Sequence, residues 1–396
     1  MRASKVFRPT LPALLPLALI AACNRAPSPP RAAPSAPQAA SSNQAATAAP
    51  RPPEYAATGI DINSVVADSQ VVADASVPVP ASRATPAPAD LATPASNAVE
   101  NAMPPPAQAS AADASLPKDS PLRAQVLLDR SYFSPGEIDG SAGSNQKRAV
   151  MAYQEAHGLP ASGSLDQATW AKLDADTAPI LVDYTLTQAD IDGPYAQIPT
   201  DTMAKAELDA LPYSSVEEML GEKFHASPAL LRKLNPGADF GVAGTVLAVP
   251  NVDPPRALPA PAEVVVVKSL SALRLVDAEG TLLAQFPVTT GSAQFPLPIG
   301  EWTINGVARD PAWHFDPRLI AGTKATDKPA VIPAGPNNPV GVVWIDLSKE
   351  HYGIHGTPEP SKIGKTESNG CIRMTNWSAI AVSKVVKPGM TASLRE

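Results

Sequence analysis

The stretch His351–Met374, HYGIHGTPEPSKIGKTESNGCIRM, organises the C-terminal part of this chain. It holds Cys371, one of two cysteines in the 396-residue sequence, and two of the five histidines, His351 and His355. A thiol is strongly nucleophilic only as a thiolate, so a catalytic cysteine needs a base or a positive field beside it. His355 lies sixteen positions before Cys371, with glycines and prolines between them. This spacing predicts a strand, a loop that doubles back, and a second strand or turn that brings the two side chains together.

The order of the motifs in this stretch resembles a known signature. HGT, a glycine-rich loop and SNGCIRM follow the pattern of the L,D-transpeptidases of YkuD type, which runs as HGT, a variable loop and S-H-G-C-[IV]-R-[ML]. Residues 289–304 (TTGSAQFPLPIGEWTI) and 331–347 (VIPAGPNNPVGVVWIDL) resemble two further segments of the same family. Papain-like and NlpC/P60-like enzymes are excluded because their cysteine precedes the histidine. The resemblance implies a mainly β sandwich or barrel over residues 262–396, with a short helix near the C-terminus for which Asn376–Val386 is the candidate.

The same resemblance implies roles for residues around the thiol. His355 would be the general acid and base, and the Gly356 carbonyl would orient its imidazole. The backbone N–H groups of Gly370 and Cys371 would stabilise a tetrahedral oxyanion. The family usually has histidine at position 369, whereas this chain has Asn369. An asparagine amide can donate a hydrogen bond to an oxyanion or to the substrate, but it cannot carry a proton. The residues assigned to substrate binding are His351, Thr357, Ser368 and Arg373.

Structural interpretations of these residues stay open at this point. A lone cysteine is usually a small buried hydrophobe, and Arg373 could be a solvated surface arginine. His351 has the same strand parity as His355, which makes it a second candidate for the base. We expect His225 and His314 to have structural roles and not catalytic ones. No metal-binding cluster occurs in the sequence and no cofactor is expected.

The first 23 residues resemble a bacterial export signal with a site for lipid attachment. Basic residues precede an apolar run at 11–22, and Ile20-Ala21-Ala22-Cys23 resembles a lipobox in which Cys23 is diacylated. A plain signal peptide is the alternative. Asn24, which follows the cysteine, points to the outer membrane by resemblance to known lipoproteins. We therefore expect a periplasmic lipoprotein anchored in the outer membrane, where a lipidated Cys23 would leave Cys371 without an intramolecular disulfide partner.

Three further segments precede the catalytic region. Residues 24–117 are rich in Ala, Pro and Ser and bury too little apolar surface to fold, so they predict a disordered tether. Residues 118–175 predict three helices, the first capped by Ser120, and the run from GEIDG to ATWAKL resembles a small peptidoglycan-binding domain. The alternative is a generic helical module, with a core of Leu127, Val150, Tyr153 and Trp170. Residues 180–252 predict two capped helices, an Asn-Pro-Gly turn and a closing strand. This last segment resembles a glycan-binding LysM module whose first part is stretched by an insertion.

The combined pattern predicts acyl transfer on peptidoglycan. The thiolate of Cys371 would attack a tetrapeptide stem, D-alanine would leave, and an amine of a second stem would resolve the thioester as a 3→3 crosslink. His355 would take the thiol proton during attack, or already hold it in an ion pair. Water as acceptor would give a carboxypeptidase or other hydrolase, and a protein lysine would give lipoprotein anchoring. A wall-binding tether without catalysis is the rival hypothesis. The net charge of −7, without a long Lys/Arg run, does not favour a nucleic-acid partner.

Overall fold

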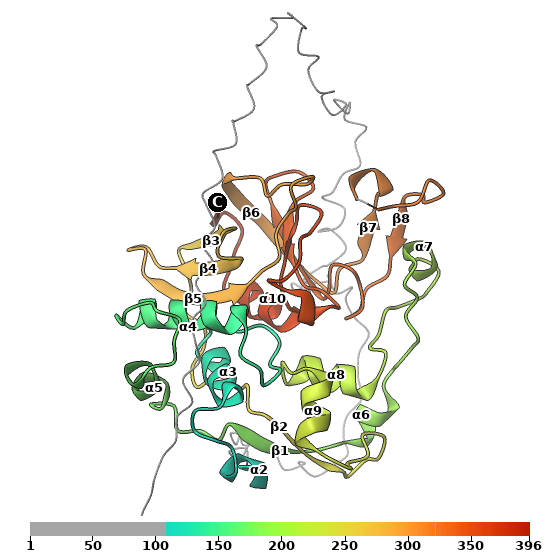
Figure 1. The fold of residues 1–396 in the computed structure, drawn as a ribbon. Helices are drawn as coiled ribbons and strands as arrows, with labels where there is room; N and C mark the ends of the chain where they lie inside the picture. The colour runs from blue at the N-terminus through green and yellow to red at the C-terminus, as the bar shows by residue number, and fades with distance from the viewer. Residues whose placement is uncertain (1–107, 321) are drawn as a thin grey trace, which may run out of the picture. The chain divides into compact units, whose positions relative to one another are not determined.

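The computed structural model describes residues 108–320 and 322–396, and both ranges belong to one compact unit of the chain (Figure 1). The predicted export signal, Cys23 and the tether up to residue 107 lie outside these ranges. Within the two ranges, every helix is too short or too polar to span a bilayer.

Three helices form the first domain, α3 (Pro121–Arg130), α4 (Ser144–Ala156) and α5 (Gln167–Leu173). Helix α3 begins at the predicted cap, because the Ser120 hydroxyl accepts the Arg123 N–H. Asp166, expected inside the third helix, instead caps α5 by accepting the Thr169 N–H. Proline at the first position of α3 lacks the N–H that a helix start leaves unpaired in any case. The core of the domain contains the predicted residues Leu127, Val150 and Tyr153, with Trp170 packed against it.

Part of the segment assigned to the tether is folded. Residues 108–117, assigned above to the tether, include helix α2 (Ala111–Ala114). The carboxylate of Asp113 accepts the backbone N–H groups of Ile180 and Leu181, both at 2.8 Å. These bonds tie the segment to the start of the next domain. The Ala/Ser composition hides this contact because it depends on one carboxylate and on backbone groups, not on an apolar pattern.

The domain at 180–252 pairs two strands and carries four short helices. The strands are antiparallel, and the two longer helices begin at the predicted caps Ser215 and Ser227. The other two helices lie in the segment interpreted as an insertion and are too short to show apolar periodicity, so the sequence did not predict them. The elements are β1 (Leu181–Thr185), α6 (Gln188–Asp192), α7 (Thr202–Lys205), α8 (Val216–Lys223), α9 (Pro228–Leu234) and β2 (Val246–Pro250).

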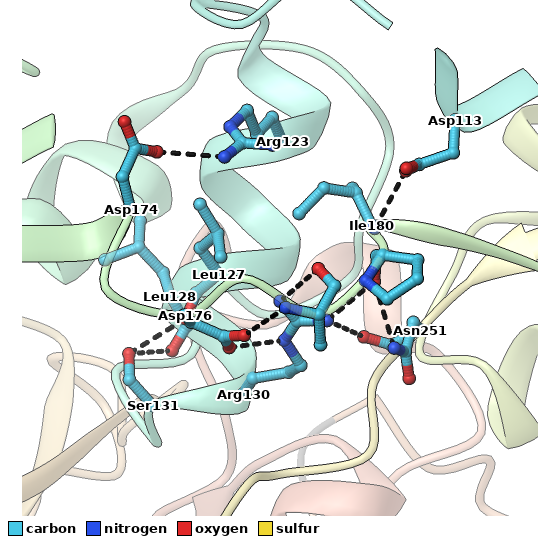
Figure 2. A network of polar contacts seen from close by, with 12 residues as sticks. Asp113, Arg123, Leu127, Leu128, Arg130, Ser131, Asp174, Asp176, Ile180 and Asn251 are labelled. Carbon is cyan, nitrogen blue, oxygen red and sulfur yellow. Dashed lines mark hydrogen bonds and ion pairs between the residues drawn. The ribbon is translucent and has the colours of Figure 1, made fainter. Parts of the chain in front are cut away.

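A buried arginine joins the helical domain to the domain at 180–252 (Figure 2). Arg130, 1% exposed at the end of α3, pairs with the Asp176 carboxylate at 2.9 Å and donates to the Pro179 carbonyl at 2.8 Å. The side chain of Asn251 donates to the same carbonyl at 2.9 Å. Burial lowers the pKa of Arg130, while the negative charge of Asp176 opposes this shift. Because a buried charge is tolerated only with its partners in place, this network holds the two domains together.

Eight strands of the C-terminal domain form one mixed sheet in the order β11-β10-β9-β6-β12-β3-β4-β5. The pairs β10–β11 and β3–β12 are parallel and the other neighbours are antiparallel. The strands are β3 (Glu263–Val267), β4 (Ala272–Val276), β5 (Leu282–Pro287), β6 (Gly300–Arg309), β9 (Val343–Leu347), β10 (Gly353–His355), β11 (Ile372–Arg373) and β12 (Thr391–Arg395). Beside this sheet, β7 (Trp313–Phe315) pairs with β8 (Ala330–Ile332), and two 3₁₀ turns cover Pro317–Leu319 and Pro360–Lys362.

The two ends of the large sheet meet beside the predicted nucleophile. Thr289, just after β5, exchanges two backbone hydrogen bonds of 2.9 Å with Arg373 of β11. Phe286 of β5 and Ile372 of β11 share one apolar core. Strands at opposite ends of the order can do this only if the sheet curls on itself. The domain is therefore the barrel-like β structure that the resemblance implies, and Cys371 lies next to its seam.

One helix, α10 (Asn376–Ser383), packs against this sheet and is three residues shorter than the predicted 376–386. The Thr375 side chain caps it by accepting the Ser378 N–H. Ala379 and Val382 are fully buried in the same core as the strands. The helix thereby places Asn376, at its first turn, against the back of β9 and β10.

The helical domain also contacts the loop between the two motifs of the C-terminal domain. Asn145 and Arg148, both on α4, donate to the carbonyls of Ile363 and Gly364 at 2.9 and 3.0 Å. This loop is the one that separates His355 from Cys371 in the sequence. The first domain therefore supports the loop that returns the chain to the thiol.

Candidate active site

Strands β10 and β11 bring the predicted base and nucleophile together. The parallel register pairs His355 with Arg373 and Ile354 with Ile372. One step back along both chains, Cys371 stands opposite Gly353. Side chains alternate along a strand, so Cys371, His355 and Arg373 share one face of the sheet. The spacing of the motifs therefore predicted the right arrangement of strand, loop and strand.

The imidazole of His355 is 3% exposed and held in one orientation. Its Nδ1 lies 2.7 Å from the Gly356 carbonyl oxygen, the contact that the resemblance implied. A carbonyl can only accept, so Nδ1 carries the hydrogen and Nε2 is the nitrogen left to take a proton. The ring also stacks on Trp344, with centroids 5.4 Å apart and planes at 17°.

Burial makes both reactive groups neutral. Burial, aided by the positive charge of Arg373, lowers the pKa of His355 to about 3, although the carbonyls of Gly356 and Val340 act in the opposite direction. Burial raises the pKa of Cys371, against the Gly353 N–H and the Arg373 charge, which act to lower it. At neutral pH the site therefore holds a thiol and a neutral imidazole. Of the two alternatives above, the structure favours proton transfer during attack over a preformed ion pair.

The thiol makes its hydrogen bond with the main chain. Sγ of Cys371 donates to the His351 carbonyl oxygen at 3.6 Å, and no hydrogen bond joins it to His355 in the described structure. The exposed ring of His351 lies instead 3.4 Å from the Glu350 carboxylate, and its backbone has φ of 67°. The contact of His351 with the thiol is thus made by its carbonyl, which argues against its ring as the base. Hydrogen bonds in a free enzyme often tighten only when the substrate binds.

Ser368 has a different position from the one predicted. It is 5% exposed, and its hydroxyl donates to the Cys371 carbonyl at 2.6 Å and accepts the Gly370 N–H at 3.2 Å. Ser368 is therefore a support inside the turn, not a substrate contact. The Gly370 N–H is already bonded in this state, so the predicted oxyanion donors not engaged in this turn are the Cys371 N–H and the partly exposed Asn369 side chain.

Thr357 is also turned inward. It is 5% exposed, its N–H donates to Oδ1 of Asn376 at 3.0 Å, and its hydroxyl accepts the Glu359 N–H at 3.2 Å. These bonds use its polar groups within the loop, so the prediction of a substrate contact is corrected here as well. In the sequence, Asn376 stood out only as the first residue of a predicted helix.

Arg373 keeps a position suited to an anionic group. Its Nε is buried and has no hydrogen-bond partner among the described residues. Its pKa is lowered by burial, and the charges of Cys371 and Glu359 act to raise it. The part of the guanidinium that stays exposed is suited to a carboxylate that arrives with the substrate.

Two aromatic residues of the site were missed by sequence reasoning. Trp344 stacks on His355, and the ring of Tyr352 lies 3.0 Å from where a Cβ on Gly370 would stand. The φ of Gly370 is 111°, so this close approach needs glycine. Burial raises the pKa of Tyr352, and the nearby negative charge of a Cys371 thiolate acts in the same direction. Trp344 lies in the quoted segment 331–347 and Tyr352 in 351–374. Their place in these motifs was the only feature of the sequence that could have indicated a role at the site.

A cavity of about 980 Å³ lies away from the thiol. Residues of all three domains line it, among them Tyr132, Glu222 and Trp377, whereas neither Cys371 nor His355 does. His225 lies at its wall, stacked on Trp377 with centroids 5.0 Å apart and with Nδ1 2.7 Å from the Asp129 carboxylate. These partners agree with the structural role expected for His225. His314 is exposed on β7.

Comparisons with known proteins identify two of the domains. Residues 261–393 match the model of an L,D-transpeptidase catalytic domain, and residues 119–173 match that of a peptidoglycan binding domain. The chain is 31% identical over 179 residues to L,D-transpeptidase YkuD of Bacillus licheniformis, covering 45% of this chain and 92% of the relative. It is 29% identical over 172 residues to YkuD of Bacillus subtilis, covering 43% and 88%.

Among solved structures, L,D-transpeptidase 3 from Mycobacterium tuberculosis in complex with a faropenem-derived adduct aligns with 39% of this chain and 75% of its own. The sequence identity is 17% and the TM-score is 0.29, which is too low for a comparison of the two folds.

Proposed function

The chain belongs to the L,D-transpeptidases with a YkuD-type catalytic domain, and from this premise we propose that Cys371 is the nucleophile of a peptidoglycan crosslinking reaction. The observation that carries the proposal is the arrangement on β10 and β11. Cys371 and His355 share one face of the sheet, and the Gly356 carbonyl holds the imidazole in the tautomer that can accept a proton at Nε2. A base on the same face as the nucleophile, with one ring nitrogen free to accept a proton, supports an acyl-transfer role for the pair.

The first half of the reaction makes a thioester. His355 Nε2 takes the proton from Cys371 as Sγ attacks the carbonyl carbon of the stem bond before the terminal D-alanine. The N–H of Cys371 and the side chain of Asn369 donate to the oxyanion. The tetrahedral intermediate then expels the amine of D-alanine, which receives the proton from His355.

The second half transfers the acyl group. The side-chain amine of another stem attacks the thioester and loses its proton to His355, which returns it to the departing thiolate of Cys371. The product is a 3→3 crosslink. Arg373 stabilises the negative sulfur during both halves, and the exposed part of its guanidinium binds a carboxylate of the stem.

We extend the proposal to the rest of the chain. The peptidoglycan-binding domain at 119–173 keeps the enzyme on the wall, and the domain at 180–252 adds contacts with glycan as a LysM-like module. The lipobox-like IAAC ending at Cys23 supports export to the periplasm and a lipid anchor in the outer membrane.

The test is incubation of the full chain with disaccharide-tetrapeptide, followed by mass spectrometry. The wild-type protein is expected to carry the acyl group on Cys371 and to release D-alanine, and the Cys371→Ala variant should do neither. Adding a disaccharide-tripeptide acceptor should yield the 3→3 dimer. If D-alanine is released without a dimer, water is the acceptor and the protein is a carboxypeptidase. Activity that survives in Cys371→Ala, or a wild-type protein that only binds the wall, would refute the proposal.

A further inference from the structure

One peptide group next to the catalytic histidine is hydrogen-bonded at both ends. The carbonyl of Gly356 accepts Nδ1–H of His355 at 2.7 Å, and the N–H of the same peptide, belonging to Thr357, donates to Oδ1 of Asn376 at 3.0 Å. A trans peptide is planar, and its C=O and N–H point in opposite directions. Holding the N–H therefore aims the carbonyl.

The side chain of Asn376 is built into this place. It is 1% exposed, and Oδ1 also accepts the Val342 N–H at 3.3 Å. A Cβ on either Gly341 or Gly356 would stand only 2.1 Å from Oδ1. Both positions therefore need glycine because the amide oxygen occupies the space that a side chain would fill.

The other half of the same amide is held by a different domain. Nδ2 of Asn376 donates to Oε1 of Glu222 at 3.2 Å and to the Pro336 carbonyl at 3.4 Å. Glu222 lies on α8 of the domain at 180–252. The partners of Nδ2 are acceptors and those of Oδ1 are donors, so the amide has one consistent orientation.

We propose that Asn376 is a positioning residue for His355, and that Glu222 of the domain at 180–252 holds Asn376 in place. The line of contacts runs from Glu222 through the Asn376 amide and the Gly356–Thr357 peptide to Nδ1 of His355. Without Asn376 the peptide can rotate, because Gly356 has no side chain to resist rotation. The carbonyl then leaves Nδ1, and the imidazole loses its fixed tautomer. This inference rests on the proposed function, since it takes His355 as the base.

The state of Glu222 fits this role. Burial raises its pKa to about 8, with smaller contributions from Glu218 and Glu137, although the bond from Asn376 acts to lower it. At neutral pH the carboxyl is therefore protonated, and its free oxygen accepts from Nδ2 without leaving a buried negative charge. Its remaining exposed surface faces the cavity described above.

The test compares full-chain variants in the acylation of Cys371 by disaccharide-tetrapeptide. Asn376→Ala should lower the acylation rate about 100-fold, the scale of a misplaced catalytic group, with KM little changed. Glu222→Gln keeps an acceptor for Nδ2 and should retain the wild-type rate, whereas Glu222→Ala should lose part of it. The matched control is Asn251→Ala, which removes another buried asparagine, 9% exposed, from a link between domains. It should cost stability but leave the rate unchanged.

A second readout separates positioning from general destabilisation. In ¹⁵N NMR the wild-type His355 should show a single Nδ1–H tautomer, and Asn376→Ala a mixture of both tautomers. If the alanine variant does not fold, Asn376→Asp is used in its place. Aspartate keeps the oxygen that accepts the Thr357 N–H, so this variant should preserve the Nδ1–H tautomer. An unchanged tautomer and rate in folded Asn376→Ala would overturn the inference. A wild-type protein that forms no acyl-enzyme would refute the proposed function, and the NMR spectra would still test the positioning.

Discussion

The rings of Trp344 and His355 stack across β9 and β10, where the two residues are direct register partners. Gly353 lies two residues before His355 on the same face of β10. A Cβ there would stand 2.4 Å from Cζ2 of Trp344. The indole thus takes the space of the missing side chain, and the imidazole is held between an aromatic ring on one strand and Arg373 on the other.

Gly353→Ala should therefore disturb the site. The added methyl group pushes the indole off the imidazole, which should cost about 1–3 kcal/mol of stability and lower the acylation rate about tenfold or more. Denaturant unfolding and mass-spectrometric acylation measure the two effects. Gly306→Ala, on β6 of the same sheet, is the matched control because nothing lies within 4 Å of its added Cβ. Equal effects of the two substitutions would contradict this account.

The thiol of Cys371 should titrate above the usual value of ~8.5. Burial raises its pKa, so the thiolate fraction and the rate of alkylation by iodoacetamide should still be rising at pH 8. Because the pKa of His355 is lowered to about 3, no step from imidazole protonation should appear between pH 5 and 7. A rate independent of pH from 5 to 8 would instead indicate a preformed ion pair.

Removal of the Arg373 charge should shift the pKa values of both Cys371 and His355. This charge lowers the pKa of Cys371 and that of His355, so Arg373→Met should raise both values and slow alkylation at pH 7 about tenfold for each pKa unit of the thiol. Arg373→Lys should restore the alkylation rate in part but not the affinity for the tetrapeptide, because lysine lacks the planar fork. Arg309→Met removes an exposed arginine of β6 and should leave the profile unchanged. An unshifted profile in Arg373→Met would show that the charge does not act on the thiol.

Glu222 should make stability depend on pH. Its pKa is raised from 4.5 in an ordinary carboxyl to about 8 in the fold, so the native state binds more protons between these values. Its contribution is complete below pH 4.5 and is lost as the pH rises to about 8. Glu222→Gln should therefore become more stable than the wild type on going from pH 5 to pH 8, by a few kcal/mol. Urea unfolding at several pH values measures the difference, and a gap independent of pH would disprove the shift.

Arg130 should be essential to the joint between the first two domains. Arg130→Ala leaves the partly exposed Asp176 carboxylate and the Pro179 carbonyl without their buried donor, which should cost about 1–3 kcal/mol. Arg123→Ala, on the same helix, breaks a pair with Asp174 that is about half exposed and should cost less than ~1 kcal/mol. Chemical unfolding of both variants tests the contrast. A small loss in Arg130→Ala would mean that the network does not bear on stability.

Several predictions from the sequence failed for a common reason. Ser368 and Thr357 stand in the right motifs, yet both are buried and their hydroxyls form hydrogen bonds within the loops. The N–H of Gly370 likewise donates to the Ser368 hydroxyl, within the same turn. A motif shows which residue types are near the thiol, but the path of each turn decides whether a polar group points outward. Residues 108–117 were missed because their bonds use backbone groups, which every sequence contains.

The sequence by itself determined the candidate nucleophile and base, which remain predictions, and the starts of several helices, because each depends on neighbours in the chain. The caps Ser120, Ser215 and Ser227 act on N–H groups three residues away, and the order of HGT and SNGC sets which strand carries which group. Only the tertiary structure decided that the thiol and imidazole are neutral and that Asn376 aims His355 with help from Glu222, 154 positions away. Burial and charge at a site are sums over segments that the chain brings together only on folding.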